Sequence, residues 1–191
     1  RVKAVLARAD LPAGILSQDM GDALVAPGFI DLQVNGGGGV LFNNDPTVSG
    51  IRTICEAHAR FGTTALMVTL ITDAPEIKRE AIAAGEAAAK SGEPGYLGLH
   101  LEGPHLSIAR KGTHDPALIR PMAQADLDYL VAQASHFGIP MITVAPESVT
   151  PDQVKRLVEA GYRVSLGHTD TSCAGVGAYV EAGATLVTHL F

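Results

Sequence analysis

Three side chains with the chemistry of metal ligands stand at equivalent points of the sequence. Glu102, His168 and His189 lie near the ends of the apolar runs GYLGLHLEG, RVSLGHT and TLVTHLF. Imidazole and carboxylate are ligands of zinc, and three protein ligands leave a fourth position open for water or substrate. An ion held in that way would polarise the carbonyl group of a bound substrate. The spacing therefore predicts a catalytic metal site rather than a structural one.

Each of these residues also has a structural explanation when it is taken singly. A histidine near a strand end is often a hydrogen-bonded core residue, and Glu-Gly-Pro is a common turn sequence. The prediction of a metal site therefore depends on the joint placement of the three residues at the ends of separate strands.

A basic stretch, ARKGTH, follows Glu102 in a predicted loop. Because such loops roof the active site of a barrel, His114 is a candidate for contact with a substrate oxygen, and Arg110 and Lys111 for attraction of an anionic group. The alternative is an ordinary solvated loop.

The remaining histidines carry weaker signals. His100 alternates with Glu102 along one predicted strand, so both can face the same side of the sheet. His105 lies in the loop just after Glu102, and its role is open. His58 and His136 fall in predicted helices, where we expect surface or core residues.

Alternating strands and helices must position these residues. Short apolar, β-branched runs predict strands at 29–36, 64–72, 95–103, 140–147, 163–169 and 185–191. Helical patterns, several opened by Pro, Asp or Ser and followed by Gly, lie at 47–60, 74–90, 123–136, 151–160 and 172–182.

This alternation predicts an α/β protein with parallel strands, as either a (β/α) barrel or a doubly wound sheet. Polar residues at the strand ends favour the barrel, whose site is built from the C-terminal ends of several strands. They are Gln33, Asn35, Glu102, Glu147, His168 and His189, and Gln33 and Asn35 are possible site residues of the first strand. We therefore predict a partial (β/α)8 barrel over residues 26–191, in which six βα units are present and the barrel does not close. Residues 1–25 are expected to be the end of a small flanking β domain.

Composition narrows the choice of partner. The formal charge is -6 and no Lys/Arg-rich block occurs, which argues against nucleic acid. No apolar run is long enough to cross a bilayer, so we expect no membrane contact and a cytoplasmic location. Cys55 and Cys173 are too far apart in sequence to form a C-x-x-C motif. The glycine run 36–39 lacks the Lys-Ser ending of a phosphate-binding loop. A small-molecule substrate fits best.

Several motifs together resemble the N-acetylglucosamine-6-phosphate deacetylases of the amidohydrolase superfamily. The motifs are APGFIDLQVNGGGG (26–39), HLEGPHLS (100–107), KGTH (111–114), TVAPE (143–147), SLGHT (165–169) and THLF (188–191). They occur in the order typical of that family and extend from near residue 25 to the end of the chain.

The resemblance implies hydrolysis of the N-acetyl group of N-acetylglucosamine 6-phosphate, in amino-sugar catabolism. It assigns Glu102, His168 and His189 as metal ligands and places Thr113 and His114 against the substrate. Many amidohydrolases carry a His-x-His pair in the first strand, where this chain has Gln33-Val34-Asn35. Amide groups are poorer ligands than imidazole, so one ion is expected, zinc or iron(II).

The resemblance also implies residues beyond those present. A general-base aspartate is expected after Phe191, together with phosphate-binding residues, and the complete protein is expected to be a homodimer. We therefore predict that these 191 residues alone are inactive. Two alternatives stay open, namely an amidohydrolase acting on a cyclic amide or another N-acyl compound, and a noncatalytic sugar-phosphate binding domain.

Overall fold

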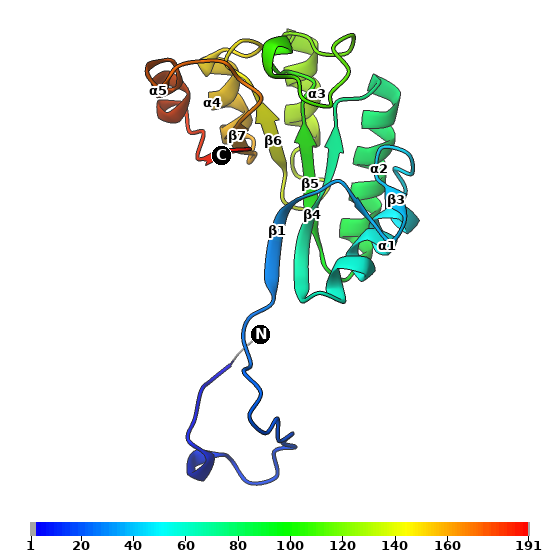
Figure 1. Ribbon diagram of the computed structural model, residues 1–191, viewed down its shortest axis with the longest axis vertical. Coiled ribbons are helices and arrows are strands. Elements are labelled where there is room, and N and C mark those ends of the chain that lie inside the picture. Colours follow the sequence, from blue (N-terminus) through cyan, green and yellow to red (C-terminus); the bar gives the residue numbers. More distant parts are fainter. Residues whose placement is uncertain (1–2, 191) are drawn as a thin grey trace.

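Six parallel strands form one curled sheet in the computed structural model, which describes residues 3–190 (Figure 1). The strands are β1 (Phe29–Val34), β4 (Thr63–Ile71), β5 (Tyr96–Glu102), β6 (Met141–Val144), β7 (Arg163–Leu166) and β8 (Leu186–Val187). They lie in the sheet in the same order as in the chain, and every neighbouring pair is parallel. All six C-terminal ends therefore reach the same edge of the sheet.

Five α-helices connect these strands. They are α1 (Val48–Ala59), α2 (Pro75–Ser91), α3 (Gln124–Gln133), α4 (Pro151–Glu159) and α5 (Cys173–Glu181). Local sequence explains where several of them begin, because the side chains of Thr47, Thr150 and Ser172 accept hydrogen bonds from backbone N–H groups of the first turn. Helix α2 ends at Gly92, whose left-handed backbone suits glycine.

The hydrophobic core lies between the sheet and the helices. Its fully buried members include Ile54 from α1, Leu66 from β4, Leu99 from β5 and Leu157 from α4. These near-continuous apolar strands are typical of parallel sheets that are covered by helices. The predicted α/β architecture is confirmed as a curled parallel sheet with helices, and the predicted strands and helices all occur.

The main difference in boundaries is at the last strand. The sequence predicted a strand over 185–191, but among the described residues β8 contains only Leu186–Val187, and residue 191 lies outside the described part. The extended backbone cannot continue, because His189 has a φ of 58°, in the left-handed region.

The glycine run forms a small hairpin that the sequence did not predict. Strands β2 (Gly36–Gly37) and β3 (Val40–Leu41) pair antiparallel and lie against α1. A Cβ atom at Gly37 would lie 3.0 Å from the ring of His58, and the His58 Nε2–H donates to the Gly36 carbonyl at 3.0 Å. The glycines therefore permit close packing of the hairpin on the helix.

Residues 3–28 extend away from the sheet (Figure 1). They contain one short 3-10 helix, η1 (Arg8–Asp10), and no strand is assigned within 3–28. The flanking β domain expected for residues 1–25 thus remains a prediction. Among residues 3–190, no helix combines the length and the apolar character that a membrane crossing requires.

Candidate metal centre

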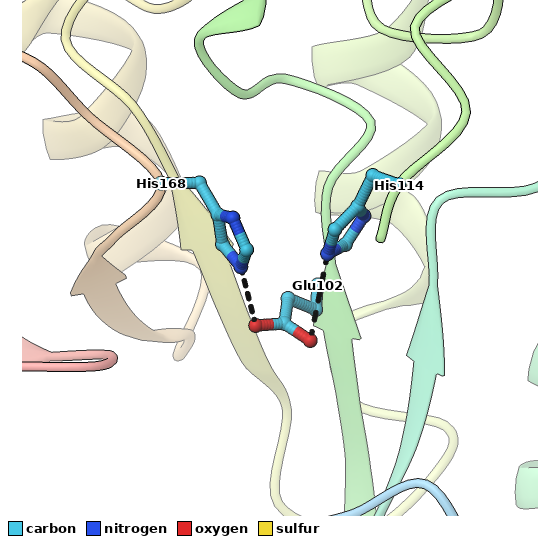
Figure 2. A group of neighbouring side chains, drawn as sticks. All are labelled: Glu102, His114 and His168. Atoms are coloured by element: carbon cyan, nitrogen blue, oxygen red, sulfur yellow. Dashed lines mark hydrogen bonds and ion pairs between the residues drawn. The ribbon is translucent and has the colours of Figure 1, made fainter. Parts of the chain in front are cut away.

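A cluster of imidazole and amide groups surrounds the carboxylate of Glu102, the last residue of β5. Figure 2 shows two of the imidazoles, those of His114 and His168, pointing toward Glu102. One carboxylate oxygen of Glu102, Oε1, lies 3.0 Å from His168 Nε2 and 3.1 Å from His189 Nε2. The other oxygen, Oε2, accepts a hydrogen bond from Gln33 Nε2 at 2.9 Å and lies 3.8 Å from His114 Nε2. The three predicted metal ligands are therefore neighbours, with Gln33 and His114 beside them.

The backbone is unusual at two of these residues. His168 follows β7 with a φ of 51°, and His189 follows β8 with a φ of 58°. Residues other than glycine rarely adopt this left-handed conformation, and it tends to occur at functional sites. Both strands stop just before the histidine, and both imidazole rings reach the same carboxylate oxygen.

The second ring nitrogen of His168 fixes its hydrogen positions. Its Nδ1–H donates to the Arg110 carbonyl at 2.9 Å, because a carbonyl oxygen can only accept. A neutral His168 would then present a lone pair at Nε2 to the Glu102 oxygen, which is also an acceptor. His168 Nε2 and the Glu102 oxygen therefore need a positive charge between them, either a proton or a metal ion. In the protein without metal, the hydrogen bond to Glu102 raises the pKa of His168.

Glu102 is ionised despite its burial. Burial acts to raise the pKa of its carboxyl group, but the hydrogen bond from His168 and the neighbouring imidazoles outweigh burial, so the pKa lies below its ordinary value. A buried carboxylate of this kind requires positive or donor groups around it.

His114 carries its ring hydrogen on the other nitrogen from His168. The backbone N–H of Thr72 donates to its Nδ1 at 3.3 Å, and the Thr72 hydroxyl lies 2.7 Å from the same atom. The ring proton is therefore on Nε2, on the side that faces Glu102. Burial lowers the pKa of His114 to about 4, so the ring is neutral. His114 thus offers an N–H donor, not a lone pair, to whatever binds there.

Three other residues from the sequence analysis have different surroundings. Thr113 is exposed in the loop before His114. Asn35 is half-buried, and its backbone carbonyl accepts from Phe42 N in the β2–β3 hairpin. Arg110 forms an exposed ion pair with Asp170.

Two further residues from the sequence analysis have structural partners instead. Glu147 accepts hydrogen bonds from the Thr169 hydroxyl and the Asp170 N–H, so it holds the loop after β7. His100 points into the buried interior of the sheet and contacts Thr143. Sequence reasoning missed Thr72, and no motif marked it as the partner of His114.

The sequence matches the Amidohydrolase family over residues 24–186, which is most of the chain. The chain belongs to the amidohydrolase family. Among its relatives, an N-acetylgalactosamine-6-phosphate deacetylase from Shewanella sp. (strain ANA-3) is 46% identical over 164 residues, covering 86% of this chain and 41% of that protein. An N-acetylglucosamine-6-phosphate deacetylase from Haemophilus influenzae is 35% identical over 189 residues, covering 99% and 49%.

The fold agrees with a solved amidohydrolase structure. The crystal structure of N-acetylglucosamine-6-phosphate deacetylase from Pasteurella multocida superposes with a TM-score of 0.91 at 34% identity, covering 98% of this chain and 49% of that one. The chain spans about half the length of these relatives. The resemblance drawn from the sequence motifs is therefore confirmed for the part of the fold that the chain contains.

Amidohydrolases are metal-dependent, and the residues around Glu102 fit a metal ion. Glu102, His114 and His168 each offer a ligand atom within 4.8 Å of the others. The ring hydrogens distinguish the two histidines as candidate ligands. Neutral His168 presents a lone pair at Nε2, whereas His114 carries its proton there. The carboxylate and imidazole chemistry matches a zinc-type donor set.

Proposed function

We propose that the complete protein containing this chain hydrolyses the N-acetyl group of N-acetylglucosamine 6-phosphate, giving glucosamine 6-phosphate and acetate in amino-sugar catabolism. The observation that carries the proposal is the convergence of two imidazole nitrogens on one oxygen of Glu102, from the ends of separate strands. The deacetylase names of the relatives supply the substrate class.

In this proposal Glu102, His168 and His189 hold one divalent ion, with zinc preferred and iron(II) as the alternative. The ion supplies Lewis acidity toward the amide carbonyl when it is bound. Gln33 supports a single ion, because its amide N–H donates to the second Glu102 oxygen and thereby occupies it. Asn35, the other residue of the first-strand pair, is assigned no ligand role.

His114 is proposed to bind the acetyl carbonyl oxygen of the substrate. Its Nε2–H faces the cluster, and the Thr72 N–H prevents the proton from moving to Nδ1. A neutral donor that is held in place before the reaction stabilises negative charge that develops on the carbonyl oxygen. Thr113, exposed in the same loop, is proposed as a second contact to the sugar.

Further parts of the proposal concern the complete protein. The general base is expected to be an aspartate that follows residue 191, and the active form is expected to be a homodimer. The proposed location is the cytoplasm, because a sugar phosphate is charged and does not cross a bilayer unaided. The mass of the complete protein in solution, measured by sedimentation, tests whether it is a dimer.

A second candidate substrate is the C4 epimer, N-acetylgalactosamine 6-phosphate. The supporting observation is that the Shewanella relative with this activity in its name is 46% identical to the chain. Both substrates present the same acetamido and phosphate groups, so the proposed metal site serves either. The ratio of kcat/KM for the two epimers, measured with one preparation, decides between them.

The test is acetate release by the complete protein, with Glu102→Gln and His114→Gln as a matched pair. Glu102→Gln should lose both bound metal and acetate release, because it removes the charged oxygen shared by two histidines. His114→Gln should keep its metal and lose about 100- to 1000-fold in kcat, the typical cost of removing one donor to a developing oxyanion.

A folded, metal-containing protein that releases no acetate from either epimer would reject this function. The remaining alternatives would then be hydrolysis of a cyclic amide and noncatalytic binding of a sugar phosphate, which a panel of amides and a binding titration distinguish. Equal metal content in Glu102→Gln and the unmodified protein would reject the proposed ligand set.

A further inference from the structure

A second polar layer lies on the inner face of the sheet, beneath the proposed metal ligands. Its members are His100 on β5, Thr143 on β6, Ser165 on β7 and Thr188 just after β8. The first three side chains are fully buried, and Thr188 is 6% exposed. Branched apolar side chains usually fill this part of a (β/α) barrel. The polar layer is therefore a departure that needs a physical reason.

The four side chains form one continuous hydrogen-bonded chain. The Ser165 and Thr188 hydroxyl oxygens are 2.7 Å apart, and those of Thr188 and Thr143 are 2.8 Å apart. The Thr143 hydroxyl oxygen is 2.7 Å from His100 Nε2. At the far end, His100 Nδ1 lies 3.1 Å from the Leu32 carbonyl of β1. The network thus connects strands from β1 to the end of β8.

One carbonyl group sets the direction of every bond in this chain. The Leu32 carbonyl can only accept, so the His100 Nδ1–H donates to it. In a neutral ring, Nε2 then accepts from the Thr143 hydroxyl, which in turn accepts from Thr188, and Thr188 accepts from Ser165. A buried network in which each member is satisfied is rigid, and loss of one member leaves its neighbours unpaired.

The network members stand next to residues of the proposed metal centre. Leu32 precedes Gln33, His100 is two residues before Glu102, and Thr188 directly precedes His189. His189 has few restraints of its own, since its side chain is 55% exposed and its backbone is left-handed. The Thr188 hydroxyl is held from two sides, by Thr143 and Ser165, and the Thr188 N–H donates to the Leu166 carbonyl at 2.8 Å.

We infer that the chain Ser165–Thr188–Thr143–His100 is a positioning network that holds His189 against Glu102 and so sets the affinity of the metal centre. The inference rests on the proposed function, because it assumes that His189 and Glu102 bind the ion. Groups behind the ligands commonly orient them, and loss of such groups typically lowers metal affinity by about 10- to 100-fold.

The test is metal affinity of the complete protein, measured without turnover. The metal-free protein is titrated with Co2+, followed by visible absorption, and with Zn2+ against a chelator of known affinity. Thr188→Val keeps the branched shape and removes the hydroxyl, whereas Thr188→Ser keeps the hydroxyl. We expect Thr188→Val to lose about 10- to 100-fold in affinity and Thr188→Ser to restore most of it.

Tyr162→Phe is the control for a general loss of stability. The Tyr162 hydroxyl is buried and donates to the Leu130 carbonyl at 3.1 Å, within the apolar core that packs against the helices. Its removal deletes a buried hydrogen bond that has no connection to the network. We expect Tyr162→Phe to keep the metal affinity and the cobalt spectrum of the unmodified protein.

The outcomes separate this inference from the proposed function. Metal binding that disappears in Glu102→Gln but is unchanged in Thr188→Val would overturn the network and leave the metal centre intact. An equal loss of affinity in Tyr162→Phe would also overturn it. Absence of metal binding in the unmodified protein would reject the proposed function itself.

Ser165→Ala provides the test if Thr188→Val does not fold. It removes only the outermost donor and its bond to Thr188, so the other three bonds, down to the Leu32 carbonyl, remain. We expect a smaller loss of affinity than in Thr188→Val, about 10-fold, at the lower end of the effects seen when groups behind metal ligands are removed. Unchanged affinity in folded Ser165→Ala would count against the network.

Discussion

The histidines in the described part of the chain differ mainly in what their ring nitrogens face. His100 and His105 each donate from Nδ1 to a backbone carbonyl, and burial lowers the pKa of each to about 4. His168 also donates to a carbonyl, but its other nitrogen faces the Glu102 carboxylate, and its pKa is raised. One residue type thus supplies a structural support at two positions and a candidate metal ligand at a third.

His105 provides a prediction about stability and pH. Its ring is fully buried, and its Nε2 has no hydrogen-bond partner among the described residues. The pKa is about 4 in the folded state and 6.5 for the ordinary side chain, so the unfolded chain takes up the proton first as the pH falls. The stability due to a neutral His105 is therefore complete above pH 6.5 and is lost as the pH falls toward 4.

Between pH 8 and pH 5, protonation of this one group should cost about 2 kcal/mol of unfolding free energy. Urea unfolding of the complete protein at both pH values measures it. His105→Gln should remove that part of the pH dependence, and His136→Gln, at an exposed position, should not. The same pH dependence in His105→Gln and in the unmodified protein would contradict the prediction.

Residue types and spacing led us to expect that Glu102, His168 and His189 lie together, and they do, while their role as metal ligands stays a prediction. Each of the three carries a ligand-type side chain at the end of a strand or two residues after it, which is why the sequence marked them. Thr72, Thr143 and Ser165 carry no comparable signal, since a threonine or serine in a strand is common and its partner lies on another strand. Their roles depend on register across the sheet, which the sequence of one strand does not contain.

At the scale of elements, a glycine contact sets how closely β5 and the loop before β6 approach. Gly98 of β5 bridges Gly138, and a Cβ atom at Gly98 would lie 2.1 Å from the Ile139 carbonyl oxygen. Backbone atoms cannot move aside as a flexible side chain can. This contact therefore fixes the position of β5, the strand that carries Glu102.

Gly98→Ala should accordingly destabilise the complete protein by about 1–3 kcal/mol or more, as expected for an overpacked interior. Gly177→Ala is the matched control, because Gly177 is exposed within α5 and its added methyl group would meet no atom within 4 Å. It should stabilise the protein by up to about 1 kcal/mol. Chemical denaturation measures both changes, and an equal stability for the two variants would refute the packing argument.

The strand and helix rhythm was predictable because its signals are local. Apolar β-branched runs, helix caps and terminal glycines lie within a few residues of each boundary. The β2–β3 hairpin was not predictable in that way, because four glycines permit many conformations and the partner surface is α1. The early end of β8 was not predicted either, and His189, just after it, contacts Glu102, which is far away in sequence.

At the scale of the whole molecule, the two edge strands of the described sheet present apolar side chains to solvent. Phe29 and Ile30 on β1 are 71% and 65% exposed, and Val187 of β8 and Leu190 beyond it are 57% and 65% exposed. A cavity of about 780 Å³, bounded largely by apolar side chains of β7, α5 and β8, continues this surface. Exposed edges of this kind are templates for association with another chain.

A polypeptide of these 191 residues should therefore self-associate as its concentration rises. Sedimentation velocity over a range of concentrations measures this. The double variant Phe29→Lys with Val187→Lys should reduce association, because charge on an edge strand opposes pairing. Lys substitutions at Leu11 and Leu16, which are exposed but lie outside the sheet, are the control. A concentration-independent monomer would contradict the prediction.

Because each strand pairs with the one synthesised just before it, the sheet can assemble in step with the ribosome. Glu102 emerges 87 residues before His189, roughly 4 to 17 s earlier at ordinary elongation rates. His168 follows Glu102 by 66 residues, so until His168 is made the carboxylate has neither histidine as a partner, and afterwards it lacks only His189. Gln33 on β1, whose amide donates to Glu102 in the folded structure, is made before Glu102. We therefore expect the amide of Gln33 to serve the nascent chain as a temporary counterpart for Glu102.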